Sequence, residues 1–394
     1  MTDAAEALMP EASLTVELIE SMRARAGTEL RIEHSIFNEV ATRLAAVKFA
    51  DGIGDINPLW TDPEHALRSP YRGPVAPPTF VIGCFSGIQF GWPGLGSFHS
   101  STRIRFHRPV YWHDTITPTC RYVGFDGPKR SAFADQMVID HFANRYTNQL
   151  GELVAEIDWD VINFERGTAR DRNGNGSRPE VPHRWSEEEV AAIEARVRAE
   201  QPRGWRARFV EDVAVGDEVD ALTKGPVGLT DEIAFLAGGG APIPRLAAHA
   251  AALQAYQRHP DWSFRDPETG AQEPIYSVHY NRQAANAMGV AYPYDVGFQR
   301  QCWHVHHLTH WASDFGWVKE VEAEYRRFVH LSDVVTLSGT VTAKRVDEDG
   351  EHVVDIETRA LNQRGENVMP GRAVVALPCR SAFDSPAGSR ARRG

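Results

Sequence analysis

The chain has 394 residues, of which 42% are hydrophobic and 24% are charged, a profile typical of a soluble globular protein with room for two domains. Its formal net charge of −11 argues against a bulk electrostatic partnership with nucleic acid or with an anionic membrane surface. The acidic N-terminus lacks the apolar core of a secretory signal, and no apolar run approaches the roughly 20 residues that cross a bilayer. Since the four cysteines show no CxxC spacing, we expect a cytoplasmic protein with reduced cysteines.

The first half of the chain is predicted to run from loops and short helices to a buried helix and then to long strands. The loop-rich segment covers about 50–75, and the apolar helix covers about 78–90. Runs rich in β-branched and aromatic residues predict strands at 115–123, 131–142 and 153–164. One helix followed by consecutive antiparallel strands is an α+β layer, in which the helix covers one face of the sheet.

The middle of the chain separates two halves of similar length. Residues 167–182 are rich in Gly, Asn, Arg and Pro and cannot bury enough apolar surface to order themselves, so they form a linker or a long surface loop. Ser186 and Glu189 have the spacing of a capping box, which opens a short helix. We divide the chain into an N-terminal domain (1–166), a linker and helix (167–204), a C-terminal domain (205–380) and a disordered tail (381–394).

The second half is predicted to repeat this order. A loop-rich segment at 275–293 precedes a helix at 297–312, and strands follow at 334–346, 351–361 and 371–378. An apolar stripe predicts that the helix buries one side. The stripe consists of Phe298, Cys302, Val305, Leu308 and Ala312.

Several features of the two halves coincide when the first half is shifted by 219 positions. The motif Phe106-x-Arg108-x-Val110-x-x-x-Asp114 matches Tyr325-x-Arg327-x-Val329-x-x-x-Asp333, Ala66 matches Ala285, and Trp92 matches Trp311. After a five-residue deletion, the pentad Asn148-Gln149-x-Gly151-Glu152 matches Asn362-Gln363-x-Gly365-Glu366, with each Gly in a tight hairpin turn. We infer a duplicated domain whose two sheets can pair within one chain, which removes an exposed edge from each.

The segment that carries a family resemblance begins with Gly54-Asp55-Ile56-Asn57-Pro58-Leu59-Trp60 and continues with Gly73-Pro74-x-Ala76-Pro77-Pro78-Thr79-Phe80. It closely resembles the signature of MaoC-like hydratases, as does Phe106-His107-Arg108-Pro109-Val110. Residues 209–217 resemble the strand that opens a second such domain. The N-terminal part is most similar to the fatty-acid-synthase-type dehydratase domains fused ahead of a MaoC-like partner. The resemblance implies a double hot-dog fold, each half a long helix wrapped by an antiparallel sheet, and an acyl-CoA or acyl-carrier thioester as ligand.

In that family, the pattern D-x-N-P-x-H supplies an Asp and a His that together hold a water and add it to the double bond of an enoyl thioester. A backbone N–H at the start of the buried helix holds the enolate-like oxygen. The first half keeps Asp55 and Asn57 but has Trp60 where the His belongs. In the second half, His279 matches Trp60, whereas Pro274 matches the Asp.

The position at the start of the helix also differs between the halves. Gly297 lies where the resemblance places the oxygen-binding N–H, whereas its counterpart, Pro78, has no N–H. We therefore predict a catalytic site in the C-terminal half, with His279 as general acid or base, and Asp55 in a different, pseudo-equivalent site. The candidates to replace the missing acid are Glu273, Tyr276 and Asp295.

Each of these assignments has a structural alternative. His279 can be a hydrogen-bonded loop histidine, and Gly297 can be a helix-start glycine. Asp55 and Asn57 can serve only to cap the next helix, and for this pair the structural reading is favoured.

Two histidines of the second predicted helix, His306 and His310, have the i,i+4 spacing of metal ligands. Since no HExxH motif and no acidic third ligand accompany them, we predict no metal and no redox cofactor. Trp303 and His306 are assigned instead to the wall of an acyl tunnel, with a domain interface as the alternative, and Asn57 and Trp60 are assigned to substrate binding. Arg300 is assigned to a substrate carboxylate or a CoA phosphate, with an interdomain hydrogen bond as the alternative.

The resemblance and the residues together predict an acyl-thioester hydratase or dehydratase, a lyase acting on a bulky or aromatic acyl group. Two alternatives stay open. The first is a hot-dog thioesterase or isomerase, because the fold does not determine the chemistry. The second is a non-catalytic subunit that binds the acyl group for a partner. A homodimer formed through helix faces or strand edges is also expected.

Overall fold

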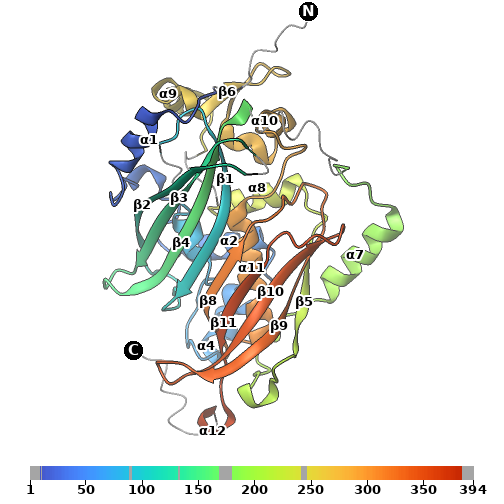
Figure 1. Ribbon diagram of the computed structural model, residues 1–394. Helices are drawn as coiled ribbons and strands as arrows, with labels where there is room; N and C mark the ends of the chain where they lie inside the picture. Colours follow the sequence, from blue (N-terminus) through green and yellow to red (C-terminus); the bar gives the residue numbers. More distant parts are fainter. Residues whose placement is uncertain are drawn as a thin grey trace, which may run out of the picture.

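The computed structural model describes residues 9, 11–87, 91–131, 134–167, 180–240 and 246–383. Its main element is one antiparallel sheet of nine strands in the order β2-β3-β4-β1-β8-β11-β10-β9-β5 (Figure 1). The strands are β1 (Gly96–Phe106), β2 (Thr117–Lys129), β3 (Met137–Thr147), β4 (Leu153–Phe164), β5 (Glu218–Lys224), β8 (Trp317–Glu324), β9 (Val335–Val346), β10 (His352–Asn362) and β11 (Gly371–Ala376). A second sheet contains β6 (Ser263–Arg265) and β7 (Gln272–Pro274).

The two halves of the chain meet where β1 pairs with β8. The antiparallel register runs from Ser101 opposite Glu324 to Arg105 opposite Glu320. Because each half contributes what would otherwise be an exposed edge strand, the pairing satisfies the backbone groups of both edges. The expectation that two α+β units share one sheet is therefore confirmed.

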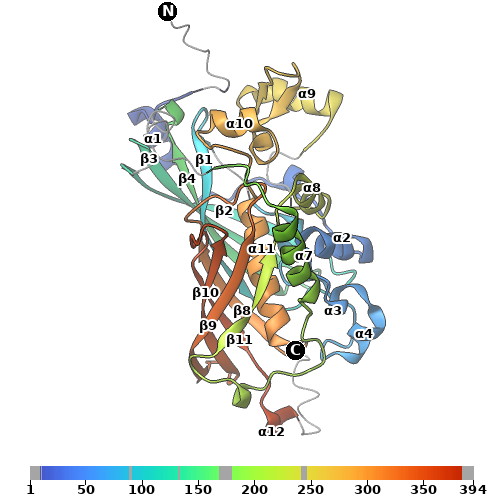
Figure 2. The same cartoon turned by 90° about the vertical axis from the view of Figure 1, so that its right-hand side faces the viewer.

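The central helix α11 (Gly297–Ala312) lies between the sheet and helices α2, α3 and α4 of the first half (Figure 2). The helices other than α11 are α1 (Val16–Arg23), α2 (Arg43–Ile53), α3 (Pro58–Thr61), α4 (Pro63–Arg68), α5 (Phe80–Cys84), α7 (Glu187–Ala199), α8 (Leu229–Ala237), α9 (His249–Arg258), α10 (Arg282–Ala287) and α12 (Arg380–Phe383). Short 3-10 helices are η1 (Glu33–Ser35), η2 (Val210–Asp212), η3 (Pro260–Trp262) and η4 (Ile275–His279). In the described part of the chain, no helix is long and apolar enough to cross a membrane.

The prediction that α11 buries only one side is wrong. Its polar residues are buried as well, among them Gln299, Arg300, His304 and His307. The helix is enclosed because the strands β8 and β9 contact it on one side, while α2 of the first half contacts it on another.

The duplication is visible in hydrogen bonds that recur 219 positions apart. The N–H of Ala76 donates to the carbonyl of Val110 at 2.9 Å, and the N–H of Asp295 donates to the carbonyl of Val329 at 2.9 Å. The helix α4 spans 63–68 and α10 spans 282–287, the same interval after the shift. The register that places His279 at the position of Trp60 is thus continuous through the loop.

The hairpin pentads repeat in the same way. The Nε2 of Gln149 donates to Asp114 at 2.9 Å, and the Nε2 of Gln363 donates to Asp333 at 2.7 Å. The turn glycines Gly151 and Gly365 have φ of 76° and 75°, the left-handed conformation that glycine adopts without steric cost.

Other sequence predictions can be compared element by element. The predicted strand 153–164 and helix 297–312 have the bounds of β4 and α11, and the capping box of Ser186 and Glu189 opens α7. The predicted strand at 209–217 is wrong. That segment forms η2 and a turn in which Asp217 accepts from the N–H of Ala214, and β5 begins only at 218.

The predicted helix at 78–90 is shorter than expected within the described residues. Only α5 forms there, because the backbone becomes extended at Phe85. Residues 88–90 of that prediction lie outside the described residues, as do 168–179 of the predicted linker and 384–394 of the predicted tail.

Candidate active site

A cavity of about 1050 Å³ lies between strands β1 and β4 of the first half and the segment 275–300 of the second half. Aromatic side chains form much of its wall, namely Trp92, Phe98, Trp159, Trp262, Tyr294 and Phe328. Five residues predicted for the site line it: Tyr276, His279, Asp295, Gly297 and Arg300. The other five, Asp55, Asn57, Trp60, Trp303 and His306, are not among its lining residues.

His279 ends η4 and faces the cavity as a neutral imidazole. Its Nδ1 lies 2.8 Å from the carbonyl oxygen of Tyr294. A carbonyl only accepts, so Nδ1 carries the proton and Nε2 keeps its lone pair in the neutral ring. Burial lowers the pKa of His279 to about 4, so the ring is an unprotonated base at neutral pH.

The start of α11 presents unbonded N–H groups to the same cavity. The N–H groups of Gln299 and Arg300 both donate to the carbonyl of Val296, at 2.9 and 3.2 Å. Within the described ranges, the N–H groups of Gly297 and Phe298 have no acceptor. The first N–H groups of a helix have no partner inside it and carry the positive end of its dipole, so this terminus suits a developing negative charge.

A glycine is required at 297 for steric reasons as well. A Cβ built on Gly297 would lie 2.5 Å from Nδ1 of His99, a residue of β1. The His99 ring contacts Phe298 and Tyr325, with ring centroids 4.4 and 4.5 Å apart. Burial lowers the pKa of His99 to about 3, so this histidine is also neutral. Nothing in the sequence pattern around His99 indicates that it reaches the site.

Of the candidate acids, Asp295 is already paired. Its carboxylate is buried and accepts two hydrogen bonds from Arg300, at 2.5 and 2.8 Å. Arg300 also donates to the carbonyls of Arg327 and Val368 at 3.0 and 3.2 Å. Arg300 thus holds the segment 295–300 against its own half of the chain. Glu273 lies on β7 and is not among the residues that line the cavity.

Tyr276 is a candidate donor whose ring packs beside His279. The two ring centroids are 4.6 Å apart, and the buried Tyr276 hydroxyl has no hydrogen-bond partner in the described part of the chain. Glu232 of α8 lies near this tyrosine, and sequence reasoning missed it. Both Glu232 carboxyl oxygens are buried without a partner among the described residues. Burial and the nearby charge of Asp295 raise the pKa of Glu232 well above its ordinary value.

The Asp55 loop of the first half forms a separate and filled site. Asp55 accepts from the indole Nε1 of Trp60 at 2.8 Å and from the N–H of Asn57 at 3.0 Å. Asn57 caps α3 by accepting from the N–H of Leu59 at 3.0 Å. Burial raises the pKa of Asp55, but the two histidines of α11 and the Asn57 N–H outweigh it and hold that pKa below its ordinary value.

The side chains differ at two matched positions of the halves. His306 and His310 reach Asp55 Oδ1, at 3.5 and 3.2 Å. After the shift of 219, their counterparts are Gly87 and Gly91, which line the large cavity. The two imidazoles fill the space beside Asp55, whereas Gly87 and Gly91 carry no side chain; a Cβ at Gly87 would lie 2.3 Å from Trp159, and one at Gly91 would lie 2.9 Å from Met22.

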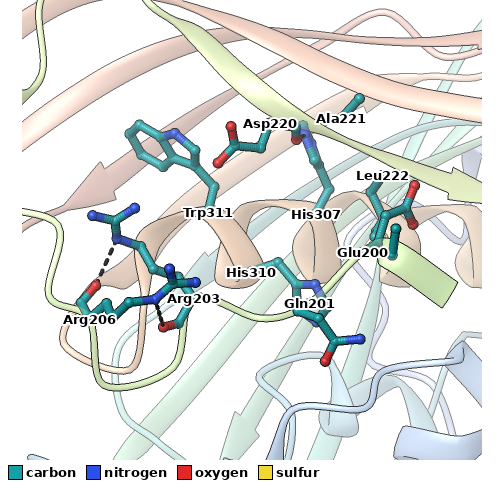
Figure 3. Close-up of a pocket in the computed structure, with 11 residues that line it drawn as sticks. Glu200, Gln201, Arg203, Arg206, Asp220, Ala221, Leu222, His307, His310 and Trp311 are labelled. Carbon is teal, nitrogen blue, oxygen red and sulfur yellow. Dashed lines mark hydrogen bonds between the residues drawn. The ribbon is translucent and has the colours of Figure 1, made fainter. Parts of the chain in front are cut away.

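A smaller pocket of about 230 Å³ lies over the C-terminal part of α11. Figure 3 shows His307 extending toward Asp220 and His310 toward Gln201. The Nε2 of His307 lies 2.8 Å from the carbonyl oxygen of Asp220. Trp303, by contrast, is buried in a hydrophobic cluster that includes Leu222.

Comparison with known proteins gives the family of the chain. Residues 32–157 match the family model described as the FAS1-like, dehydratase domain region. A UPF0336 protein of Parafrankia sp. is 32% identical over 133 residues, which are 32% of this chain and 83% of the relative. A UPF0336 protein of Thermobifida fusca is 38% identical over 88 residues, which are 20% of this chain and 57% of the relative. The chain therefore belongs to the family of these UPF0336 proteins, and its residues 32–157 match a FAS1-like dehydratase domain region.

Solved structures extend the likeness to both halves. A MaoC-like dehydratase covers 91% of this chain and 99% of its own length, with a TM-score of 0.59 and 14% identity. A putative MaoC domain protein dehydratase from Chloroflexus aurantiacus covers 90% of this chain and 96% of its own length, with a TM-score of 0.56 and 14% identity. A conserved hypothetical protein of Mycobacterium tuberculosis, described as having a double hot-dog fold, covers 89% of this chain and 96% of its own length, with a TM-score of 0.50 and 15% identity. The fold of this chain is thus the double hot-dog.

Proposed function

We propose that the protein is an acyl-thioester hydratase or dehydratase that works in the large cavity between its two halves. The observation that carries the proposal is the shared wall of that cavity, which combines a neutral His279 with the free N–H groups at the start of α11. Hydration of an enoyl thioester needs a base for water and fixed donors for the thioester oxygen. Both requirements are met by residues of one half.

In the proposed reaction, Nε2 of His279 removes a proton from water. The hydroxide oxygen bonds to the β-carbon, and the electron pair of the double bond moves toward the thioester carbonyl, whose oxygen gains negative charge. The N–H groups of Gly297 and Phe298 stabilise that oxygen. His279 then returns its proton to the α-carbon, which completes the addition of one water molecule, and dehydration is the reverse.

Tyr276 takes the position of the missing acid in this proposal. Its buried hydroxyl has no partner within the described residues, and burial raises its pKa well above its ordinary value. The group therefore stays protonated and can donate a hydrogen bond to water or substrate. A donor of this kind orients water but does not accept its proton, so His279 is the only base in the reaction we propose.

The cavity also supports a proposal about substrate. Its volume of about 1050 Å³ and its aromatic wall suit a bulky or aromatic acyl group. The arginines that line it include Arg326, Arg327 and Arg364, and two-thirds of the Arg327 side chain is exposed. Guanidinium groups bind phosphate well, so this rim suits the phosphates of a CoA or acyl-carrier thioester.

The test is to incubate the pure protein with a panel of enoyl-CoA thioesters of increasing acyl size. We expect water addition without release of free CoA, fastest with bulky acyl groups. Release of free CoA would instead indicate a thioesterase. Tight binding without turnover would indicate a non-catalytic acyl-binding protein, and either outcome would overturn the proposal.

A further inference from the structure

A second group of ionisable side chains lies outside the cavity, where the Asp55 loop of the first half meets α11 of the second. Three ligand-type atoms face one another there: Asp55 Oδ1, His306 Nε2 and His310 Nε2. The two imidazole nitrogens are 2.8 Å apart, and they lie 3.5 Å (His306) and 3.2 Å (His310) from the carboxylate oxygen. The cluster is independent of the residues that carry the proposed hydration.

Hydrogen bonds among these three atoms cannot satisfy all three contacts at once. The carboxylate oxygen only accepts, and two nitrogens 2.8 Å apart share at most one proton. If both His306 and His310 donate to Asp55, the two N–H groups face each other. If one histidine donates to the other, the accepting nitrogen has no proton left to donate to Asp55. A cation at the centre would satisfy all three lone pairs together.

The geometry is close to what a transition metal requires. Zinc binds nitrogen and carboxylate oxygen at about 2.1 Å, which in a tetrahedral site separates ligand atoms by about 3.4 Å. The observed separations of 2.8, 3.2 and 3.5 Å need only small side-chain movements to reach it. The second carboxylate oxygen of Asp55 is held by the Trp60 indole at 2.8 Å, so Oδ1 is the oxygen that points to the histidines.

The cluster has access to solvent on one side. Asp55 and His306 are almost fully buried, but His310 lines the smaller pocket beside Gln201 (Figure 3). That pocket gives an ion a way in and leaves space for a water ligand. Lys224 Nζ lies 2.8 Å from Nδ1 of His306 and donates to the carbonyls of Ile53 and Gly54 at 2.7 and 3.3 Å. A metal on Nε2 leaves the ring proton on Nδ1, so in the metal-bound form that N–H donates to Lys224 as a neutral amine.

A second cluster of possible metal ligands differs because a lysine side chain already pairs with it. Asp347, Asp349 and Glu351 also lie close enough together to hold an ion. There the ammonium group of Lys319 pairs with all three carboxylates. The lysine next to the Asp55 cluster, Lys224, instead contacts Nδ1 of His306 and donates to two backbone carbonyls, so it does not occupy the space between the three ligand atoms.

We propose that Asp55, His306 and His310 bind one divalent transition-metal ion, with water from the smaller pocket as a further ligand. Histidine with carboxylate suits zinc, cobalt or iron rather than calcium or magnesium, which prefer oxygen alone. The ion joins a loop of the first half to the central helix of the second, so it stabilises the association of the halves.

The test uses the full chain after its metal has been removed with EDTA and dialysis. Binding of ZnCl₂ is measured by calorimetry, and binding of CoCl₂ is measured by visible absorption. We expect one ion per chain, cobalt absorption bands typical of nitrogen and oxygen ligands in a site of low coordination number, and a rise in Tm with zinc because the ion binds the folded state. Absence of both calorimetric binding and cobalt bands in the unaltered protein would overturn the proposal.

Four variants locate the site. We expect His310→Ala and Asp55→Asn each to weaken zinc binding by more than about 100-fold, because each loses a ligand. Trp60→Phe loses only a hydrogen bond to a ligand and should cost about 10- to 100-fold. His307→Gln is the matched control, since His307 lies on the same helix and lines the same pocket but bonds to Asp220, and its zinc affinity should stay within a few-fold.

Circular dichroism and Tm of the metal-free variants establish that they are folded. Zinc affinity that is equal in the His310 and His307 variants would place the ion elsewhere and refute the assignment. Because binding is read without any thioester, this result is separate from success or failure of the hydration assay.

Discussion

Replacing His279 with Gln gives the sharpest test of the proposed chemistry. The Gln amide can still donate to the carbonyl of Tyr294, as Nδ1 of His279 does at 2.8 Å, but it has no basic lone pair to replace Nε2. A positioned general base accelerates proton transfer by about 10²- to 10⁴-fold. We therefore expect kcat/KM for hydration to fall by that factor, a rise of about 3–5 kcal/mol in the barrier.

The pH dependence of the unaltered protein follows from the same residue. A base acts only when neutral, and burial lowers the pKa of His279 to about 4. Activity should therefore stay nearly constant from pH 7 to pH 5 and fall only as the pH approaches about 4. A histidine at its ordinary pKa of 6.5 would be only about 3% neutral at pH 5 and would lose most of its activity over that range.

The matched control is His330→Gln. His330 lines the same cavity, and its Nδ1 also faces a backbone carbonyl, that of Tyr292 at 3.2 Å. We expect its kcat/KM to stay within a few-fold of that of the unaltered protein. Equal losses in both variants, or no loss in His279→Gln, would refute the assignment of the base.

Three further predictions concern stability, measured by urea unfolding. Gly297→Ala should lower the free energy of unfolding by about 1–3 kcal/mol, because the new Cβ would lie 2.5 Å from His99. Adding His99→Ala should recover part of that loss, and additive losses in the double variant would contradict this steric explanation. Asp295→Asn should cost about 3–5 kcal/mol by leaving the buried Arg300 without its carboxylate, and a cost below about 1 kcal/mol would show that the pair is not buried in solution. Burial lowers the pKa of His99 and His304 to about 3, so between pH 6.5 and about 3 the unfolded chain binds protons that the native state does not. The free energy of unfolding should fall with decreasing pH across that window, and His304→Gln should make its dependence on pH less steep. A free energy of unfolding that does not change from pH 7 to pH 4 would contradict this prediction.

The sequence predicts best those parts of the fold that carry strong local patterns. β4 is a long alternating strand and α11 carries a continuous apolar stripe, and both have the predicted bounds. β1 and β8 were not predicted, because they pair with each other at the centre of the sheet while presenting charged residues on one face. Arg103 of β1 and Glu320 of β8, 2.9 Å apart, satisfy each other only after the halves have joined.

The candidate site could be predicted in part, for a related reason. The duplication places His279 and Gly297 in register, and both line the cavity. His99 and Glu232 come from β1 and α8, so no local motif connects them to that loop. The contact between Asp55 and His310 joins residues 255 positions apart, and for that reason the acidic partner of the i,i+4 histidines was not found from the sequence.

The pairing of β1 with β8 has an evolutionary consequence. In a dimer of two identical chains, any substitution near the symmetry axis changes both pockets at once. Here the two pockets are encoded separately, so glycine at 87 and histidine at 306 can coexist around one pseudo-axis. Covalent fusion therefore allows one pocket to keep space for a large ligand while the other acquires a different polar lining. Neither substitution needs to appear in the other pocket.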